Sequence, residues 1–163
     1  MRHSLNAALL LSTLLCPIAA WSQKYTGPMP SKPDVPYLVH ADTLVETESA
    51  EAKEQKAPKK EEITYIVPGA NSAVKTPLAS PILLFQTDKL SAEKLQMYKL
   101  EARNGNREIT FSNKKKNTAK PVNISVNRVA EGLYRIEVTD SLPNGEYALT
   151  PEGSNQVFCF AID

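Results

Sequence analysis

The fold is decided by the stretch LYRIEVTDSLPNGEYALTPEGSNQVFCFAID, residues Leu133–Asp163. Apolar and polar residues alternate in YRIEV (134–138) and again in EYAL (146–149), with Asn144–Gly145 between the two runs. Such alternation is typical of strands with one buried face, and Asn-Gly is typical of a tight turn between antiparallel strands. VFCFAI (157–162) is apolar at both parities, which indicates a strand covered on both faces. This stretch therefore predicts a small antiparallel β domain.

Further strands are predicted upstream, because short apolar or alternating runs recur between turn residues. These runs lie at residues 63–67, 82–85, 98–102 and 122–126. Residues 88–94 are polar and predict a turn with at most one turn of helix. Seven or eight short strands with this spacing favour an all-β antiparallel sandwich. The Cys, Trp, Cys signature of antibody domains is absent, so the predicted sandwich is immunoglobulin-like only in the loose sense.

Asn104–Gly105 predicts a hairpin with a defined register. The two residues suit the two positive-φ positions of a type I′ turn. A two-residue loop at this point pairs Leu100 with Ile109, Tyr98 with Phe111, and Glu101 with Glu108. The apolar residues of both strands then share one face, and the like-charged glutamates face each other on the exposed side.

The first 22 residues predict a signal peptide. A basic residue precedes the apolar run AALLLSTLLCPIAA, and Ala20–Ser22 has the small-x-small pattern of a cleavage site, so we expect cleavage between Ser22 and Gln23. The run is shorter than the roughly 20 residues that span a bilayer. Leu15 stands before Cys16, where a lipoprotein signal has a small residue, which argues against lipid anchoring through this cysteine. We therefore expect an exported protein, periplasmic or extracellular, without a transmembrane span.

Residues 23–61 are predicted to be a disordered linker, Pro-rich at first and Glu/Lys-rich later, and residues 62–163 to be the sandwich domain. The linker composition offers too little apolar surface to offset the entropy lost on ordering. Two apolar segments interrupt it and could dock on a protein partner or on the domain itself. One has the apolar residues Val35, Tyr37, Leu38 and Val39, and the other is Leu44–Val45. Residues 47–60 could also form a transient charged helix.

The predicted domain contains few residues that are suited to catalysis or to metal binding. The two histidines of the chain, His3 and His40, precede the domain, which excludes His-based nucleophilic sites and His-ligated metal sites from it. Glu131 with Glu137 or Asp140 could form a carboxylate pair, but scattered surface acids are the norm in a domain of this size. We therefore expect no enzymatic activity, no cofactor and no bound metal.

One lysine-rich loop is the main candidate for binding an anionic lipid or polymer. Its residues are Lys114, Lys115, Lys116 and Lys120. The alternative is a solvated loop tip that protects a hairpin from edge pairing. The net charge of the whole chain is only +1, so nucleic acid is not an expected partner.

Cys159 is the only cysteine that remains if the signal peptide is removed, so we expect no intramolecular disulfide. It lies between Phe158 and Phe160, which predicts a buried and inert thiol. The tyrosines of the domain fall on predicted inner faces, where they are expected to belong to the core rather than to a ligand site. They are Tyr65, Tyr98, Tyr134 and Tyr147.

Five short motifs between residues 63 and 163 occur together: a PGA-containing first strand, the hairpin RNGNREI, then GLYRIEV, LPNGEYAL and a terminal VFCFAID. In this combination the chain resembles a group of uncharacterised exported bacterial proteins whose C-terminal β domain ends in a PGEYAL-type turn and an aromatic-rich last strand. The chain departs from that pattern at Asn144, Cys159 and Ala161, where the group has proline, an acidic residue and glycine. The resemblance implies a fold and brings no activity with it.

Two functions from different classes remain. The first is a non-enzymatic module of the periplasm or cell envelope that binds an envelope protein, for example by pairing along a sheet edge. The alternative is a surface- or ligand-binding module that recognises an anionic polymer or lipid through the lysine-rich loop. The long predicted linker favours the first.

Overall fold

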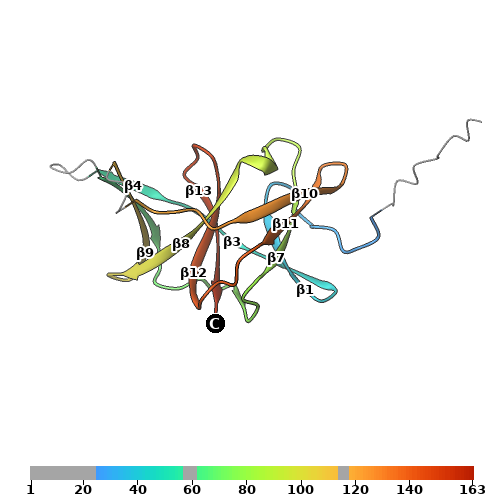
Figure 1. Cartoon of the computed structure of the whole chain (residues 1–163), viewed down its shortest axis with the longest axis horizontal. Helices are drawn as coiled ribbons and strands as arrows, with labels where there is room; N and C mark the ends of the chain where they lie inside the picture. Colours follow the sequence, from blue (N-terminus) through green and yellow to red (C-terminus); the bar gives the residue numbers. More distant parts are fainter. Residues whose placement is uncertain (1–24, 57–61, 114–117) are drawn as a thin grey trace, which may run out of the picture.

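The protein is all-β and antiparallel, as the sequence predicts. The computed structural model describes residues 25–56, 62–113 and 118–163, which contain thirteen strands and one short 3₁₀ helix, η1 (Ala92–Lys94). The strands form two sheets, which lie side by side along the long axis of the molecule (Figure 1). The only parallel pair among the described strands joins the two-residue β6 (Lys75–Thr76) to β13 (Gln156–Ile162).

The smaller sheet has five strands. In spatial order they are β10 (Ile124–Ala130), β11 (Leu133–Val138), β7 (Ile82–Gln86), β1 (Pro36–His40) and β2 (Thr43–Glu46). One face of this sheet packs on the larger sheet through Leu38, Leu83, Phe85 and Ile136, all of which are fully buried.

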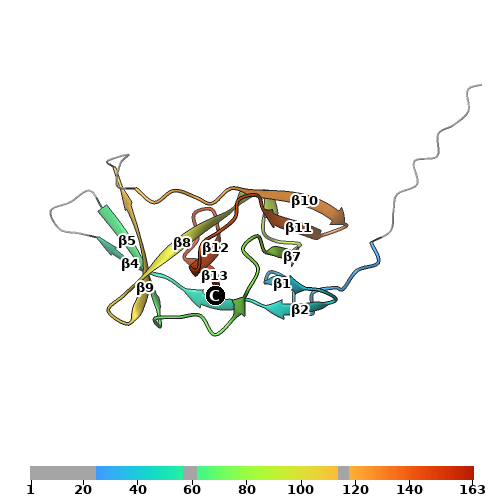
Figure 2. The same ribbon diagram turned by 60° about the horizontal axis from the view of Figure 1, so that its bottom comes forward.

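The larger sheet curls back on itself. Its spatial order is β3 (Glu48–Glu51), β13, β12 (Gly145–Pro151), β8 (Leu95–Arg103), β9 (Asn106–Ser112), β5 (Glu62–Pro68) and β4 (Lys53–Lys56). The first and last strands of this order are consecutive in the chain, with only Ala52 between them. The two ends of the sheet therefore belong to one continuous stretch of backbone, and the strands enclose an interior (Figure 2). We call this part the curled sheet.

β13 takes part in two separate cores, which explains why its sequence is apolar at both parities. Phe158, Phe160 and Ile162 pack between the two sheets. Val157 and Cys159 point the other way, into the curled sheet. The expectation of an interior strand with two covered faces is confirmed, because β12 and β3 pair with its two edges.

The Asn104–Gly105 hairpin has the predicted turn, but of the three predicted pairs only Glu101 with Glu108 is formed, and the pairs Leu100 with Ile109 and Tyr98 with Phe111 are not. Both residues have positive φ, 51° for Asn104 and 75° for Gly105, and Glu101 lies opposite Glu108. The ladder then stops, because β8 pairs with β9 only over residues 101–103 and turns toward β12 over residues 95–100. The two strands thus separate beyond the paired end, while the rings of Tyr98 and Phe111 still meet across the gap.

Asn144–Gly145 serves a different purpose from the other Asn-Gly pair. It lies between β11 in the five-stranded sheet and β12 in the curled sheet, so it connects the sheets and does not close a hairpin. Only the glycine of the pair has positive φ, at 150°, which is not a type I′ turn. The positive φ of Gly145 disfavours a side chain at this crossing, whereas the nearest contact of an added β-carbon, 2.9 Å to Lys99 Cε, is with the end of a flexible side chain that can move.

The prediction of a disordered linker is wrong for residues 36–56. Residues 36–56 were expected to lie outside the domain, yet they form β1–β4 and pair with β7, β13 and β5. Strand pairing depends on backbone groups, which composition does not report, and the small side chains Ala50 and Ala52 suffice for the inner face. The transient helix considered for residues 47–60 is likewise wrong for its described part, residues 47–56.

The Pro-rich segment that precedes β1 also lies against the protein. The backbone N–H of Asp34 donates to Gln86 O at 2.7 Å, and Thr87 Oγ1 donates to Asp34 Oδ1 at 2.6 Å. Lys32 forms an ion pair with Glu46, at 2.8 Å. The segment is irregular, as its prolines predict, but it is part of the folded unit.

The predicted signal peptide lies outside the described residues. No helix within residues 25–56, 62–113 and 118–163 has the length and apolar character needed to cross a membrane.

Candidate functional site: an aromatic-lined pocket

The interior of the curled sheet is not completely filled. A pocket of about 390 Å³ opens where β8 and β9 separate. Six strands contribute to its wall, β4, β5, β8, β9, β12 and β13, together with the loop at residues 151–155. The pocket therefore lies at the mouth of a curled sheet, a common position for ligand sites in β proteins.

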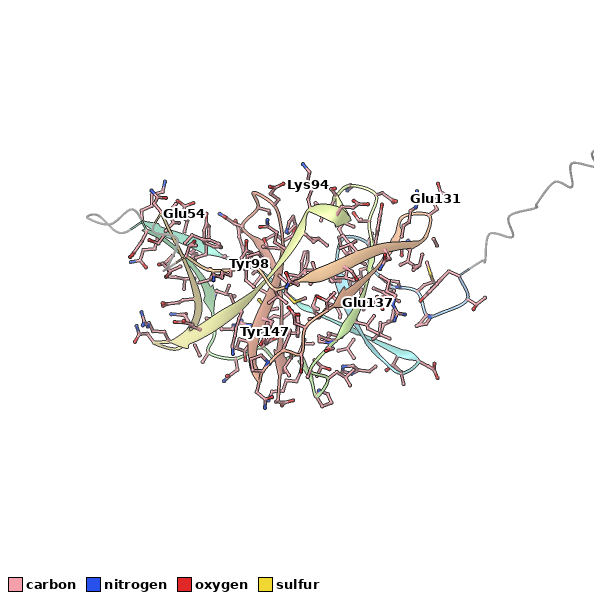
Figure 3. All side chains as sticks on the ribbon, viewed as in Figure 1. Glu54, Lys94, Tyr98, Glu131, Glu137 and Tyr147 are labelled. Carbon is pink, nitrogen blue, oxygen red and sulfur yellow. The ribbon has the colours of Figure 1, made fainter. Side chains whose placement is uncertain are left out.

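Three aromatic rings form one side of the pocket. Phe111 meets Tyr65 edge to face, with ring centroids 5.9 Å apart, and meets Tyr98 in the same way at 5.3 Å. Because edge-to-face contacts use the positive edge of one ring and the negative face of another, this arrangement holds all three rings in place. Figure 3 labels Tyr98, which projects from β8. The rigid rings give an apolar surface that costs little ordering entropy when a ligand binds.

The floor is apolar and is hollow because some of its side chains are small. Val67, Leu100 and Val157 are buried there, and Ala52 and Ala148 lie between them. An alanine in such a position leaves a void that a larger residue would fill. The pocket is therefore a consequence of side-chain size on strands that are far apart in the sequence.

Several of the lining residues carry polar side-chain groups: Glu54, Tyr65, Gln96, Tyr98, Thr150, Ser154 and Asn155. The Tyr98 hydroxyl donates to Gln96 Oε1 at 2.9 Å. Thr150 Oγ1 donates to Gln156 O at 2.9 Å. Glu54, the only charged side chain that lines the described wall, forms an ion pair with Lys56 at 3.1 Å. Burial raises the pKa of the Tyr98 phenol, so this group stays protonated at neutral pH.

The far end of the curled sheet is closed by a buried ion cluster. The Arg107 side chain is only 1% exposed and binds Glu48 through two nitrogens, at 3.0 and 2.6 Å. It also donates to Gly69 O at 3.0 Å and to Pro68 O at 2.9 Å. Glu146 completes the cluster, 3.7 Å from Arg107, and accepts from the backbone N–H of Ser72 at 2.9 Å. The cluster joins β3, β5, β9 and β12.

The cluster also shifts the pKa values of its members. Burial alone would raise the pKa of the Glu48 carboxyl, but hydrogen bonds from Arg107, Ser72 and the Ala73 backbone lower it overall. Burial would lower the pKa of Arg107, and its bonds to Glu48 raise it instead. Neither group is therefore suited to give up or take a proton near neutral pH, which favours a structural role.

Cys159 is a buried thiol, as predicted. It is fully buried, and burial raises its pKa to about 12, against the opposing effect of Arg107. A thiol in such surroundings has almost no thiolate at neutral pH and is inert as a nucleophile.

The candidate docking segment belongs to the protein's own fold. Tyr37 is 3% exposed and Leu38 is fully buried, while Val35 and Val39 are half-buried. Of the two alternatives, docking on the domain itself therefore holds for this segment, and the side chains of Tyr37 and Leu38 are buried in the protein's own fold. Of the lysine-rich loop, Lys114, Lys115 and Lys116 lie outside the described residues, and Lys120 is exposed.

Two of the acidic residues considered for catalysis, Glu137 and Asp140, have other partners. Glu137 accepts from Arg135 Nε at 2.7 Å, and Asp140 accepts from Asn123 Nδ2 at 2.9 Å. Glu131 is exposed in the turn between β10 and β11, and Figure 3 labels it together with Glu137. Among the residues that the structure describes, no group of three or more His, Cys, Asp or Glu side chains could hold a metal ion.

The tyrosines expected in the core are buried or packed against it, but two of them also line the pocket. Tyr147 belongs to the core between the sheets, and Tyr134 packs against that core. Tyr98 is buried and Tyr65 packs against the core of the curled sheet, yet both also line the pocket wall, which was not expected. The hairpin register brings Tyr98 and Phe111 to one face, which is the only sequence signal for this wall. Nothing in the register shows that the strands separate there.

Comparison of the chain with protein-family models, with curated proteins and with solved structures found no match.

Proposed function

We propose that this protein is a non-enzymatic binding module whose curled sheet holds a small apolar ligand in the aromatic-lined pocket. The observation that carries the proposal is the pocket of about 390 Å³ with three fixed aromatic rings on one side. Ligand pockets are usually concave, mostly apolar and provided with a few polar groups, in the range of roughly 300–1,000 Å³. Export to the periplasm or the cell exterior remains part of the proposal, on the basis of the predicted signal peptide.

The alternative of catalysis in this pocket has less support. The described wall contains hydroxyls, amides and one carboxylate, and that carboxylate is already paired with Lys56. General acid–base or nucleophilic chemistry needs a titratable group beside a second group that activates it. The lining residues contain no such pair.

The proposal is tested by methyl NMR with a small apolar probe, 2-acetylnaphthalene. Ile63 and Ile109 line the pocket, whereas Ile136 and Ile162 lie in the core between the sheets. Addition of the probe is expected to shift the methyl signals of the first pair and to leave those of the second pair unchanged. Equal shifts at all four positions, or none at Ile63 and Ile109, would contradict the proposal.

Two variants give the control. Ala148→Leu fills the floor of the pocket and is expected to weaken probe binding at least tenfold. The matched substitution Ala130→Leu, in the five-stranded sheet, is expected to leave binding unchanged. If Ala148→Leu proves unstable, Ile63→Trp narrows the pocket from a half-buried position instead.

A second candidate function is strand pairing with an envelope protein. β10 pairs with β11 on one side, and no described strand pairs with its other side, so its backbone could accept an added strand. A bulge between Arg128 and Ala130 and the exposed Arg128 are features that protect sheet edges, which places this candidate second.

The edge candidate is tested by photo-crosslinking in cells. A crosslinking residue at the exposed Asn127 of β10 is expected to capture one protein. In a second variant the crosslinker is placed at Ser125 and Asn127 is replaced by proline. This variant is expected to lose the captured protein, because proline interrupts an added strand. A crosslinker at the exposed Lys53, on β4, is the control. Capture of the same protein from Asn127 and Lys53 would contradict edge pairing.

A further inference from the structure

The hydrogen-bonding groups at the pocket point to the chemistry of its ligand. Tyr98 donates its hydroxyl hydrogen to Gln96 Oε1 at 2.9 Å, so the amide oxygen of Gln96 is occupied and its NH₂ group remains to donate. The hydroxyl of Tyr65 has no hydrogen-bond partner among the described residues, and it too lines the pocket. Thr150 uses its hydrogen on backbone carbonyls. The Tyr65 hydroxyl and the Gln96 NH₂ group can therefore each donate a hydrogen bond to an acceptor on a ligand.

The charges of the lining residues restrict the ligand further. Glu54 is the one charged side chain on the described wall, and its ion pair with Lys56 leaves it balanced. An ionised ligand that entered the apolar floor would lose its hydration without meeting an opposite charge there, and this is costly. A neutral ligand does not meet this cost.

The volume and shape of the pocket also restrict the size of the ligand. A dry cavity of about 150 Å³ is enough to bind benzene, so a pocket of about 390 Å³ accepts at least two fused rings. The edge-to-face arrangement of Phe111 with its two tyrosines presents ring surfaces on which a planar ring can lie.

We infer that the ligand is a neutral compound with an apolar ring system and a hydrogen-bond acceptor at one end, which the Tyr65 hydroxyl and the Gln96 amide bind. This inference rests on the proposed function, because it assumes that the pocket is a ligand site. It names a chemical class, such as an aryl or alicyclic ketone, ester or ether.

The test compares two probes of the same shape in wild-type and variant protein. 2-Acetylnaphthalene carries a carbonyl oxygen where 2-isopropenylnaphthalene carries a CH₂ group. Dissociation constants are measured for the wild-type protein, Tyr65→Phe and Gln96→Met, from the methyl signals of Ile63 and Ile109. The comparison of ratios removes the difference in hydrophobicity between the probes.

The ratio of the dissociation constant of the alkene to that of the ketone measures the preference for the ketone. This ratio is expected to fall in Tyr65→Phe and in Gln96→Met, by roughly two- to twelvefold for each lost hydrogen bond. The affinity for the alkene is expected to stay the same in Tyr65→Phe. An equal ratio in all three proteins, with both probes still bound, overturns the inference and leaves the proposed function standing. If neither probe perturbs Ile63 or Ile109 in the wild type, the proposed function itself is overturned.

A third probe tests neutrality and needs no variant. 2-Naphthoate has the same rings and an ionised carboxylate. It is expected to bind the wild-type protein more weakly than the ketone. Tighter binding of 2-naphthoate overturns the inference that the ligand is neutral. Unchanged signals of Ile136 and Ile162 in each variant show that the fold is intact before the ratios are compared.

Discussion

At the scale of single residues, Arg107 shows how a buried charge can be retained. Two bonds to Glu48 and two to backbone carbonyls occupy most of its donors, and a second carboxylate stands 3.7 Å away. Such a group is costly to bury and is kept only where every partner is in place. In this protein the partners come from β3, β12 and the C-terminal end of β5, whereas Arg107 lies on β9, so the cluster can form only when the curled sheet is assembled.

Glu48→Gln is expected to lower the free energy of unfolding by about 3 kcal/mol at neutral pH, because it leaves the buried Arg107 without its closest counter-charge. The pKa of Glu48 is lower in the folded protein than its ordinary value of 4.5. Its contribution is therefore complete above that value and is lost as the pH falls through the folded-state value. Urea denaturation between pH 7 and pH 3 measures this difference.

The gap in stability between the wild type and Glu48→Gln should narrow as the pH falls below about 4.5. Glu51→Gln, at an exposed position of the same strand, is the control. A gap that stays constant down to pH 3 would show that the carboxylate charge of Glu48 does not stabilise the fold.

Cys159 is expected to resist alkylation in the folded protein. With its pKa raised by burial to about 12, the thiolate fraction at pH 8 is on the order of one in ten thousand. Peptide mapping after iodoacetamide treatment should find this residue unmodified in buffer and modified in urea. Asn127→Cys places a thiol on an exposed strand and serves as the positive control. Rapid native labelling of Cys159 would contradict its burial.

At the scale of elements, the hairpin between β8 and β9 determines both a register and the position of the pocket. Its turn brings Tyr98 and Phe111 to one face, and the separation of the strands beyond residue 101 leaves room between them. A strand that changes partner along its length is a usual way for a sheet to curl, because each half follows a different neighbour.

Gly105→Ala is expected to lower the free energy of unfolding by about 1–2 kcal/mol, because φ at this position is +75° and a β-carbon disfavours that conformation. No atom lies within 4 Å of the added carbon, so the cost belongs to the backbone alone. Gly105→Asn is the matched variant, since asparagine tolerates positive φ better. Urea denaturation that ranks the two variants as equal would contradict this explanation.

At the scale of the whole molecule, the N-terminal strands hold the two sheets together. β1 and β2 belong to the five-stranded sheet, β3 and β4 to the curled sheet, and the four follow one another in the chain. Thr47, which connects β2 to β3, is buried and bonds to Pro36 O through both its backbone N–H and its hydroxyl. The connection between the sheets is therefore fixed and not a loose hinge.

Removal of residues 1–61 is expected to abolish cooperative unfolding. The remaining chain lacks β1–β4, so Phe85 and Val157 lose their cover and the curled sheet loses the stretch that joins its ends. A chain that starts at Tyr25 keeps every described strand and is the control. Circular dichroism during urea denaturation compares the two. A truncated protein that unfolds as sharply as the control would contradict this expectation and would support the predicted domain boundary at residue 62.

The sequence by itself determined the all-β class, most of the strands within residues 63–163, the type I′ turn and the buried thiol, because these depend on period-two patterning and on residues that are close in the chain. It predicted seven or eight strands there, where the structure has nine, because the two-residue β6 has no pattern of its own. Only the tertiary structure decided that the mostly polar segments 48–51 and 53–56 are strands, since their pairing uses backbone groups and partners up to 111 positions away, as for Glu48 and Cys159. The pocket likewise depends on Ala52 and Ala148, which are distant in the sequence, and on two strands, β8 and β9, that separate beyond a paired turn. No local pattern records how such side chains meet across a curled sheet.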